Sequence, residues 1–116
     1  MNIETISEYC LEKKGAVEDF PFDEETLVFK VGGKMFALIP LEKIPLQINL
    51  KCDPEKAIEL REQFENVQPG WHMSKKFWNT IILKGNIRWS DLKELIDHSY
   101  DEVVKGLKKS ERDKIK

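Results

Sequence analysis

Residues 46–51 constrain the fold more than any other stretch of this sequence. Apolar and polar residues alternate strictly along it, in the order Leu46, Gln47, Ile48, Asn49, Leu50 and Lys51. Successive side chains of a β-strand point to opposite faces of a sheet, so this strand has one apolar face and one polar face. The apolar face has to be covered by other elements, while the polar face can meet water. The pattern predicts a sheet with helices on one side.

Four other segments are predicted to be strands of the same sheet. They cover residues 27–31, 34–39, 71–75 and 77–84. Gly32 and Gly33 separate the first two segments. A two-residue glycine link is typical of a tight hairpin, because glycine readily adopts the positive φ that such turns require. Lys75 and Lys76 mark the predicted turn between the last two strands.

Three helices account for the remaining apolar periodicity. The first covers residues 3–14, after Asn2 and before Gly15, because asparagine caps helix N-termini and glycine commonly ends helices. The second follows Asp53 and Pro54, a capping acid and a residue suited to the first helical position. Its predicted core stripe consists of Ala57, Leu60, Phe64 and Val67.

The third predicted helix begins at Ser90, whose hydroxyl can cap it. Its predicted core stripe consists of Leu92, Leu95, Ile96, Tyr100, Val103, Val104 and Leu107. The element order is therefore α-β(3)-α-β(2)-α, a two-layer α+β fold with a five-stranded antiparallel sheet. The length fits a single domain over residues 1–116, with a charged tail at about residues 109–116 that is expected to fray.

Composition favours a cytoplasmic protein. The longest apolar run, from Met35 to Ile39, is far too short for a membrane helix, and the first residues lack the pattern of a secretory signal. The two cysteines, Cys10 and Cys52, do not form a disulfide framework, which favours a reducing compartment. We therefore expect a cytoplasmic location and no contact with a membrane.

The sequence contains no motif typical of a metal site or a catalytic nucleophile. His72 and His98 lie in no metal-binding spacing, and the acidic residues 18–25 lack the ligand spacing of a calcium loop. Cys52 precedes a predicted helix N-terminus, where the dipole can lower a thiol pKa, but free cysteines are more often small buried apolar residues. We expect a protein that is not an enzyme and has no cofactor.

Residues 69–80 are the most unusual stretch of the chain, because they combine aromatic and basic side chains. The segment reads Pro-Gly-Trp-His-Met-Ser-Lys-Lys-Phe-Trp-Asn-Thr. Lysines can contact phosphates, while aromatic rings can stack on bases or pack against sugars. The alternative is that Trp71 and Trp78 are core residues and that Lys75 and Lys76 form an ordinary polar turn.

The charge of the chain is divided unevenly. Residues 1–67 carry 14 Asp and Glu against 8 Lys and Arg, whereas residues 68–116 carry 7 against 11. A basic C-terminal half can attract phosphate, although the whole molecule, with a net charge of −2, would not. Ordinary charge patterning on helices accounts for the same asymmetry without a nucleic acid.

Several ordered segments resemble the MmcQ/YjbR family of small bacterial proteins. They are residues 18–22, 29–31, 33–38, 48–54, 69–73, 75–80 and 99–101. The resemblance runs from about Tyr9 to Leu107. It implies the same order of elements and a similarity to the fold of type III secretion chaperones, which bind proteins. Family members are commonly described as DNA-binding proteins with a double-wing shape.

The resemblance supplies no catalytic residue. Phe77 stands where the family usually has a histidine before the second tryptophan, which disfavours a titrating group at this position. Two functional hypotheses follow. In the first, the polar sheet face and the basic hairpin contact DNA. The candidate contacts are Trp71, His72, Lys75, Lys76, Trp78 and Asn79, with Gln47, Asn49, Lys51, Lys84 and Arg88 as secondary contacts. In the second, the domain binds another protein, or a second copy of itself, through exposed aromatic surface.

Overall fold

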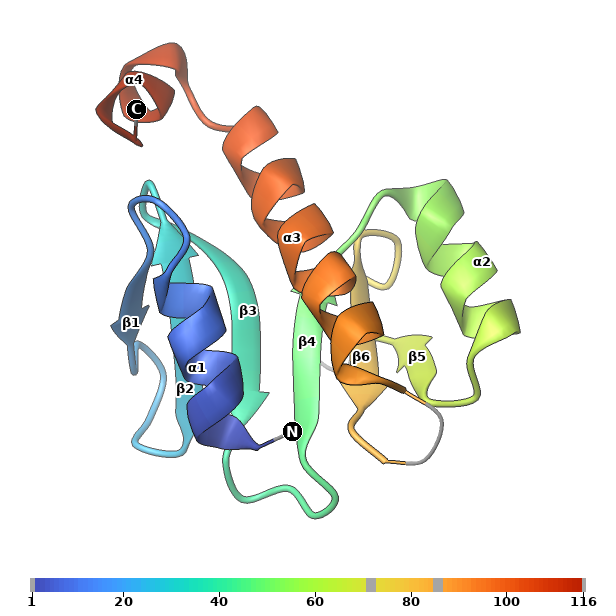
Figure 1. The fold of residues 1–116 in the computed structure, drawn as a ribbon. Coiled ribbons are helices and arrows are strands. Elements are labelled where there is room, and N and C mark those ends of the chain that lie inside the picture. The colour runs from blue at the N-terminus through green and yellow to red at the C-terminus, as the bar shows by residue number, and fades with distance from the viewer. Residues whose placement is uncertain (1, 71–72, 85–86, 116) are drawn as a thin grey trace.

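The fold is built on an antiparallel sheet (Figure 1). The computed structural model describes residues 2–70, 73–84 and 87–115. Within these residues the strands are β1 (Val17–Asp19), β2 (Thr26–Val31), β3 (Lys34–Pro40), β4 (Gln47–Lys51), β5 (Val67–Pro69) and β6 (Trp78–Ile82). Their order across the sheet is β1-β2-β3-β4-β6-β5. The helices are α1 (Ile3–Leu11), α2 (Pro54–Gln63), α3 (Trp89–Lys105) and α4 (Lys109–Ile115).

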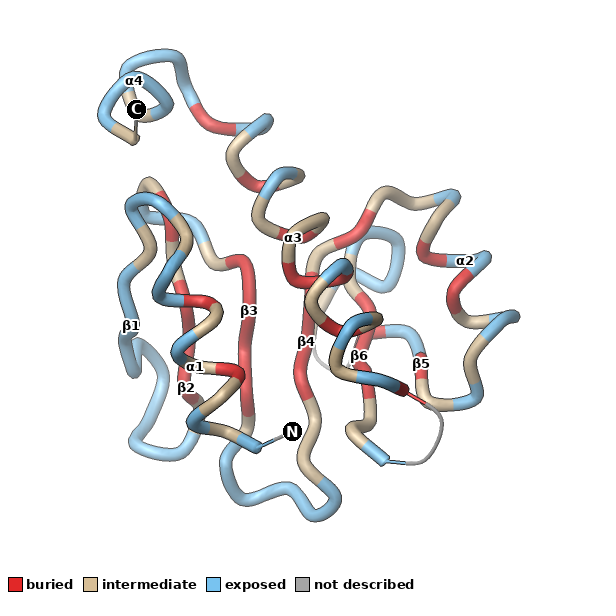
Figure 2. Tube along the Cα trace, in the orientation of Figure 1, coloured by how far each residue is buried: buried red, intermediate tan, exposed pale blue. Residues whose placement is uncertain are grey.

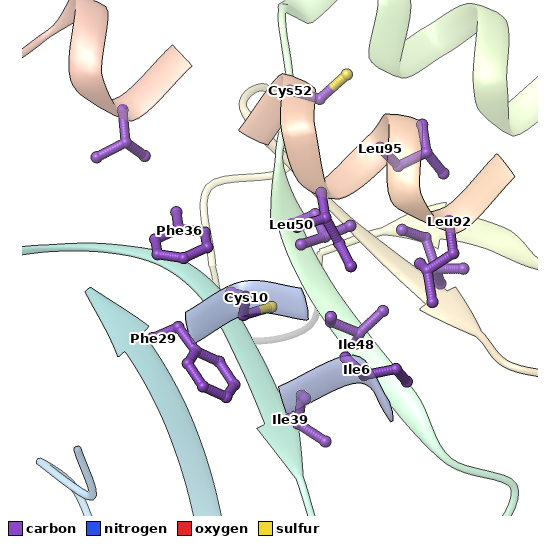
Figure 3. Close-up of a cluster of buried hydrophobic side chains, with 14 of the residues drawn as sticks. Ile6, Cys10, Phe29, Phe36, Ile39, Ile48, Leu50, Cys52, Leu92 and Leu95 are labelled. Carbon is purple, nitrogen blue, oxygen red and sulfur yellow. The ribbon is translucent and has the colours of Figure 1, made fainter. Parts of the chain in front are cut away.

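The helices lie on one side of the sheet, and the core lies between the two layers (Figures 1 and 2). Ile48 and Leu50 of β4 point into this core together with Ile6 and Cys10 of α1 (Figure 3). Leu92 of α3 joins them from the other helix over the centre of the sheet. The predicted α+β architecture with an antiparallel sheet is confirmed, and so is the apolar side of the 46–51 alternation.

Short polar contacts define where two of the helices begin. The Asn2 side chain accepts a hydrogen bond from the backbone N–H of Thr5 at 2.9 Å, which caps α1 as predicted. The Asp53 carboxylate accepts from the N–H of Lys56 at 3.2 Å, and Pro54 occupies the first turn of α2. Each cap satisfies an N–H group that has no partner within its helix.

The sheet has six strands within the described residues, so the predicted number of five is wrong. The additional strand is β1, which overlaps the acidic stretch 18–25, where no strand was predicted. It pairs with β2, with Val17 opposite Lys30, and the Lys30 ammonium lies 3.0 Å from the Asp19 carboxylate. All three residues of β1 are exposed, so its side chains show no burial alternation. An edge strand is held by backbone hydrogen bonds to its neighbour, and these bonds do not require an alternation of buried and exposed side chains.

The predicted strand at 71–75 is also wrong over its described part, because residues 73–75 are a bend and a turn. Trp71 and His72 lie outside the described residues. The edge strand is β5 instead, since α2 ends at Gln63, earlier than its apolar stripe suggested. Asn66 anchors the chain beside β6, where its side-chain amide donates to the carbonyl of Ile82 at 2.9 Å.

Two residues of the predicted stripe on α2 therefore change roles. Phe64 follows the helix in an extended conformation and is half-buried, so its predicted place in the helical core is wrong. Val67 remains buried, but as a strand residue opposite Ile81.

The chain end that was expected to fray forms the short helix α4. Its Ile115 packs against the edge of the core, which gives this charged segment an apolar anchor. The hydroxyl of Tyr100 in α3 donates a hydrogen bond to the carbonyl of Lys14, close to the same corner of the fold.

Candidate functional site

The face of the sheet opposite the helices, called the open face from here on, carries the polar residues of the alternating strand. Because Ile48 and Leu50 point into the helical core, Gln47, Asn49 and Lys51 point the other way. The strand register extends this face sideways. Its central row consists of Val28, Leu38, Asn49 and Thr80. The predicted orientation of the strand is thus correct.

Asn49 is nevertheless buried, with 8% of its surface exposed, so its prediction as a water-facing DNA contact is wrong. Its side-chain oxygen accepts a hydrogen bond from the Thr80 hydroxyl. Met73 and Phe22 come from segments outside the central strands and line a cavity together with Asn49. The alternation along residues 46–51 could not predict that Asn49 is buried, because Met73 and Phe22 are distant from it in the sequence.

A basic turn precedes β6. Lys75, Lys76 and Phe77 are all exposed, and the Lys76 ammonium lies 5.5 Å from the centre of the Phe77 ring. The carbonyl of Ser74 accepts a hydrogen bond from the N–H of Trp78 at 3.0 Å, which closes the turn. Its lysine side chains are therefore presented from a defined backbone rather than from a loose loop.

Arg61 of α2 holds this turn from the helical side. Its guanidinium donates to the carbonyl of Lys75 and, at 2.7 Å, to the side-chain oxygen of Asn79. Gly70 supports the other flank, where its N–H donates to the carbonyl of Trp78 at 2.9 Å. A Cβ at Gly70 would lie 2.8 Å from the Cβ of Trp78, so only glycine fits this approach. No local pattern in the sequence links Arg61 to the turn, so this role was not predicted.

Asn79 is not a surface contact, and this prediction is wrong. The residue is 2% exposed and lies opposite Leu50, on the helical side of the sheet. Its amide nitrogen points to the carbonyl of Ala57 at 3.4 Å, while its oxygen is engaged by Arg61. Strand alternation already contained this information, because Asn79 and Ile81 must share one face if Trp78 faces the other.

The structure does not bring Lys84 and Arg88 to the basic turn. Lys84 follows the far end of β6, so the strand separates it from Lys76 by roughly 17 Å at the usual rise per residue. The Arg88 guanidinium lies 3.3 Å from the carboxylate of Asp91, in the first turn of α3. Both residues are exposed, but they lie apart from Lys75 and Lys76.

The residues that do come together are Lys51, Lys75, Lys76 and Trp78, called the basic edge from here on. Lys51 lies directly opposite Trp78 in the pairing of β4 with β6, and the two lysines of the turn precede Trp78. Within residues 2–70, 73–84 and 87–115, no carboxylate lies within ion-pair distance of these three lysines. Three lysines without an ion-pair partner in the described parts of the chain therefore neighbour the half-buried Trp78, in sequence or across the strand pair.

The thiols are poor candidates for catalysis. Burial raises the pKa of Cys10 to about 12 and that of Cys52 to about 11. Both cysteines are free and buried. The effect of burial on Cys52 outweighs the expected influence of the following helix N-terminus, so both thiols stay protonated and unreactive at neutral pH.

His98 has a structural contact. Its Nε2 atom accepts a hydrogen bond from the backbone N–H of Asp53 at 3.1 Å, at the start of α2. Burial first, and the nearby Lys56 second, lower the pKa of His98 below its ordinary 6.5. No group of three potential metal ligands occurs in the parts of the chain that the structure describes. Within the same parts, no helix is long and apolar enough to cross a membrane.

The sequence pattern of the YjbR family matches residues 11–102. The chain belongs to the YjbR family. It is 36% identical over 114 residues to YbdF of Escherichia coli O157:H7, with 97% of this chain and 93% of the relative covered. It is 32% identical over 112 residues to YjbR of Escherichia coli K12, with 97% and 95% covered. Both relatives are described as uncharacterized proteins.

Solved structures of related proteins have the same fold. The crystal structure of DR2400 from Deinococcus radiodurans superimposes with a TM-score of 0.92 at 40% sequence identity, covering 98% of this chain and 87% of that one. A Pseudomonas syringae crystal structure gives a TM-score of 0.75 at 28% identity, with 88% and 98% covered. The predicted family is thus confirmed, together with the α+β class of its fold.

Proposed function

We propose that this domain binds duplex DNA by contacting the phosphate backbone with its basic edge. The observation that supports the proposal is the set of Lys51, Lys75 and Lys76, whose charges have no carboxylate partner among the described residues. Lysine ammonium groups act as point charges for phosphate oxygens and carry no sequence information. The proposed activity is therefore binding without strong base preference, rather than catalysis.

The shape of the basic edge fits a backbone contact better than base readout. Lys75 and Lys76 project from a turn whose backbone is held to α2 by Arg61. Phe77 is 39% exposed and stands beside them, where its ring can pack against a sugar. The amides suited to reading bases, those of Asn49 and Asn79, are buried.

Salt dependence tests the proposal. Three lysine–phosphate contacts give a slope of about −2.7 in log affinity against log salt, so affinity should fall about 40-fold between 50 and 200 mM salt. The experiment is fluorescence anisotropy of a labelled 20-base-pair duplex with the purified protein. An affinity that does not change with salt would contradict the proposal.

A pair of double variants localises the contact. In the double variant Lys75→Ala, Lys76→Ala, affinity for DNA should fall only about 3.5-fold between 50 and 200 mM salt, because one of three phosphate contacts remains. Lys108→Ala with Lys109→Ala removes the same charge from two exposed, adjacent lysines at the junction of α3 and α4. It should leave the salt slope unchanged. An equal reduction of the salt slope in both double variants would show that net charge alone, and not the basic edge, determines DNA affinity.

A protein partner is the second candidate function, and exposed apolar residues favour it. Ile44 is 96% exposed and Phe22 is 63% exposed, in the loops before β4 and before β2. Residues of this kind on a protein surface can mark an interaction site. If DNA binding is absent, sedimentation should show a self-associating species, and an Ile44→Ser variant should be monomeric. A wild-type protein that stays monomeric at high concentration would exclude self-association.

A further inference from the structure

The open face contains a cavity of about 440 Å³ that the proposed DNA contact does not use. Its lining residues are Phe22, Thr26, Met35, Leu38, Pro40, Lys43, Gln47, Asn49 and Met73. Its volume falls within the range of pockets that bind small molecules. The lining is mostly apolar with a few polar groups, which is the composition typical of such pockets.

Two amide side chains of this cavity, those of Asn49 and Gln47, have donors without partners in the part of the chain that the structure describes. Asn49 uses its side-chain oxygen to accept from Thr80, so its NH₂ group is left to donate. Within the described residues, neither this NH₂ group nor the Gln47 side chain has a hydrogen-bond partner, and no fully buried polar atom is left unsatisfied. The unused donors of Asn49 therefore remain accessible from the cavity.

Lys43 adds a charge to the same cavity. It is the one charged side chain among the described lining residues, and no carboxylate in the described parts of the chain lies within ion-pair distance of it. Glu25 and Glu42 lie close to each other near the same loops, and the Glu42 carboxyl raises the pKa of Glu25, but neither lines the cavity. Asp23 also lies nearby, where its carboxylate accepts a hydrogen bond from the backbone N–H of the lining residue Thr26. Among the described lining residues themselves, the charge is that of Lys43 and is positive.

The remaining walls are apolar. Leu38 lies on the floor and is 7% exposed, while Met35 and Met73 contribute flexible thioether side chains. Methionine side chains adapt to ligands of differing shape. Phe22 brings an exposed aromatic ring to the rim. An apolar body would be buried here, while a head group that accepts hydrogen bonds would meet the donors.

We infer that this cavity binds an amphipathic organic anion, with its apolar chain over Leu38 and its carboxylate near Lys43 and the Asn49 amide. The site is distinct from the basic edge. Phe22 and Lys43 belong to the β1–β2 and β3–β4 loops, which meet at one end of the sheet through a hydrogen bond from Leu41 N–H to the Glu25 carbonyl at 2.7 Å (Figure 1). Lys51 is at the opposite end of β4 from Gln47.

The test compares two probes of equal chain length, octanoate and 1-octanol, by titration into ¹⁵N-labelled protein. We expect octanoate to shift the backbone amide signals of Leu38 and Gln47 and to bind at least threefold more tightly than octanol. Equal affinity for the two probes would overturn the anion preference. Shifts that avoid all the lining residues would overturn the site itself.

Variants separate the cavity from other apolar surface. Leu38→Trp fills the floor and should abolish octanoate binding, whereas Val104→Trp, in a separate cavity lined by α3 and α4 residues, should leave it unchanged. Because Leu38→Trp can also disturb the sheet, Lys43→Ala on the exposed rim gives a second test. It should weaken octanoate about threefold, as for an exposed ion pair, and leave octanol unchanged. Octanoate binding that survives both changes would refute the inference.

Discussion

The two faces of the sheet use the same strands but differ in what their side chains contact. On the helical face, large apolar residues such as Phe29, Phe36 and Ile39 are fully buried against helices. On the open face, the central row of Val28, Leu38, Asn49 and Thr80 is also buried. Beside this row lie a cavity and the lysines of the basic edge, which have no ion-pair partner among the described residues. Burial of the first kind stabilises the fold, whereas donors and charges without internal partners are available to ligands. We therefore assign the largest contribution to stability to the helical face and propose the open face for binding.

The largest expected effect comes from the helical face. Phe36→Ala should lower the free energy of unfolding by about 3–5 kcal/mol, because the fully buried ring packs edge-on against Tyr100 with ring centres 5.4 Å apart. Met35 directly precedes Phe36 and is half-buried on the open face, so Met35→Ala is the matched control. It should lower the free energy of unfolding by about 1 kcal/mol or less. Urea denaturation measures both. Equal losses would break the distinction between the faces.

Phe64 should give an intermediate effect. Its ring is half-buried and packs against the core from just beyond α2, so Phe64→Ala should cost about 1–2 kcal/mol, less than a fully buried phenylalanine. The same urea experiment applies. A loss as large as that of Phe36→Ala would mean that the end of α2 contributes as much to the core as the central strands.

A smaller effect should appear as a pH dependence of stability. The pKa of His98 is lowered in the folded protein, so the unfolded chain binds a proton at this residue more readily. The stabilisation from neutral His98 is fully present above pH 6.5 and is lost as the pH falls through the lower pKa of the folded state. In the His98→Gln variant, the melting temperature should change less between pH 7 and pH 5 than in the wild-type protein. An unchanged profile would show that other groups cause the dependence.

The smallest effect is expected from the cysteines. Because burial raises both thiol pKa values, Cys10 and Cys52 should resist a thiol reagent at pH 8 in the native protein and react on unfolding. Cys52→Ser should leave DNA affinity unchanged, since Cys52 lies on the helical side of the sheet. Mass spectrometry after a short labelling pulse measures the reactivity. Rapid native labelling of Cys52 would reveal a reactive thiol that its burial does not explain.

Local periodicity predicted the parts of the fold that depend on neighbouring residues. The alternation at 46–51 placed Ile48 and Leu50 correctly, because the side chains of a strand alternate wherever it lies. It could not reveal β1, whose three residues are all exposed and which is held by pairing with β2. It also extended α2 through Phe64, because spacing alone does not show that Asn66 anchors the next segment to β6.

The candidate site was predictable to a smaller extent. The sequence identified Lys75, Lys76 and Trp78 as neighbours and named Lys51 as a secondary contact. Only the pairing of β4 with β6 shows that Lys51 lies opposite Trp78. Asn79 was misplaced although strand alternation would have assigned it to the helical side. The cavity was not predictable, since Phe22, Lys43 and Met73 come from three separate segments that only the folded chain brings together.

The most direct test of binding on the open face is a map of backbone amide signals on titration with a duplex of 12 base pairs. We expect the largest shifts at Lys51, Lys75 and Lys76, at DNA concentrations where the affinity is still sensitive to salt. The signals of Ile6 and Cys10, in α1 on the helical side of the sheet, should stay in place. Shifts confined to the helices, or no shifts at low salt, would contradict the assignment of binding to the open face.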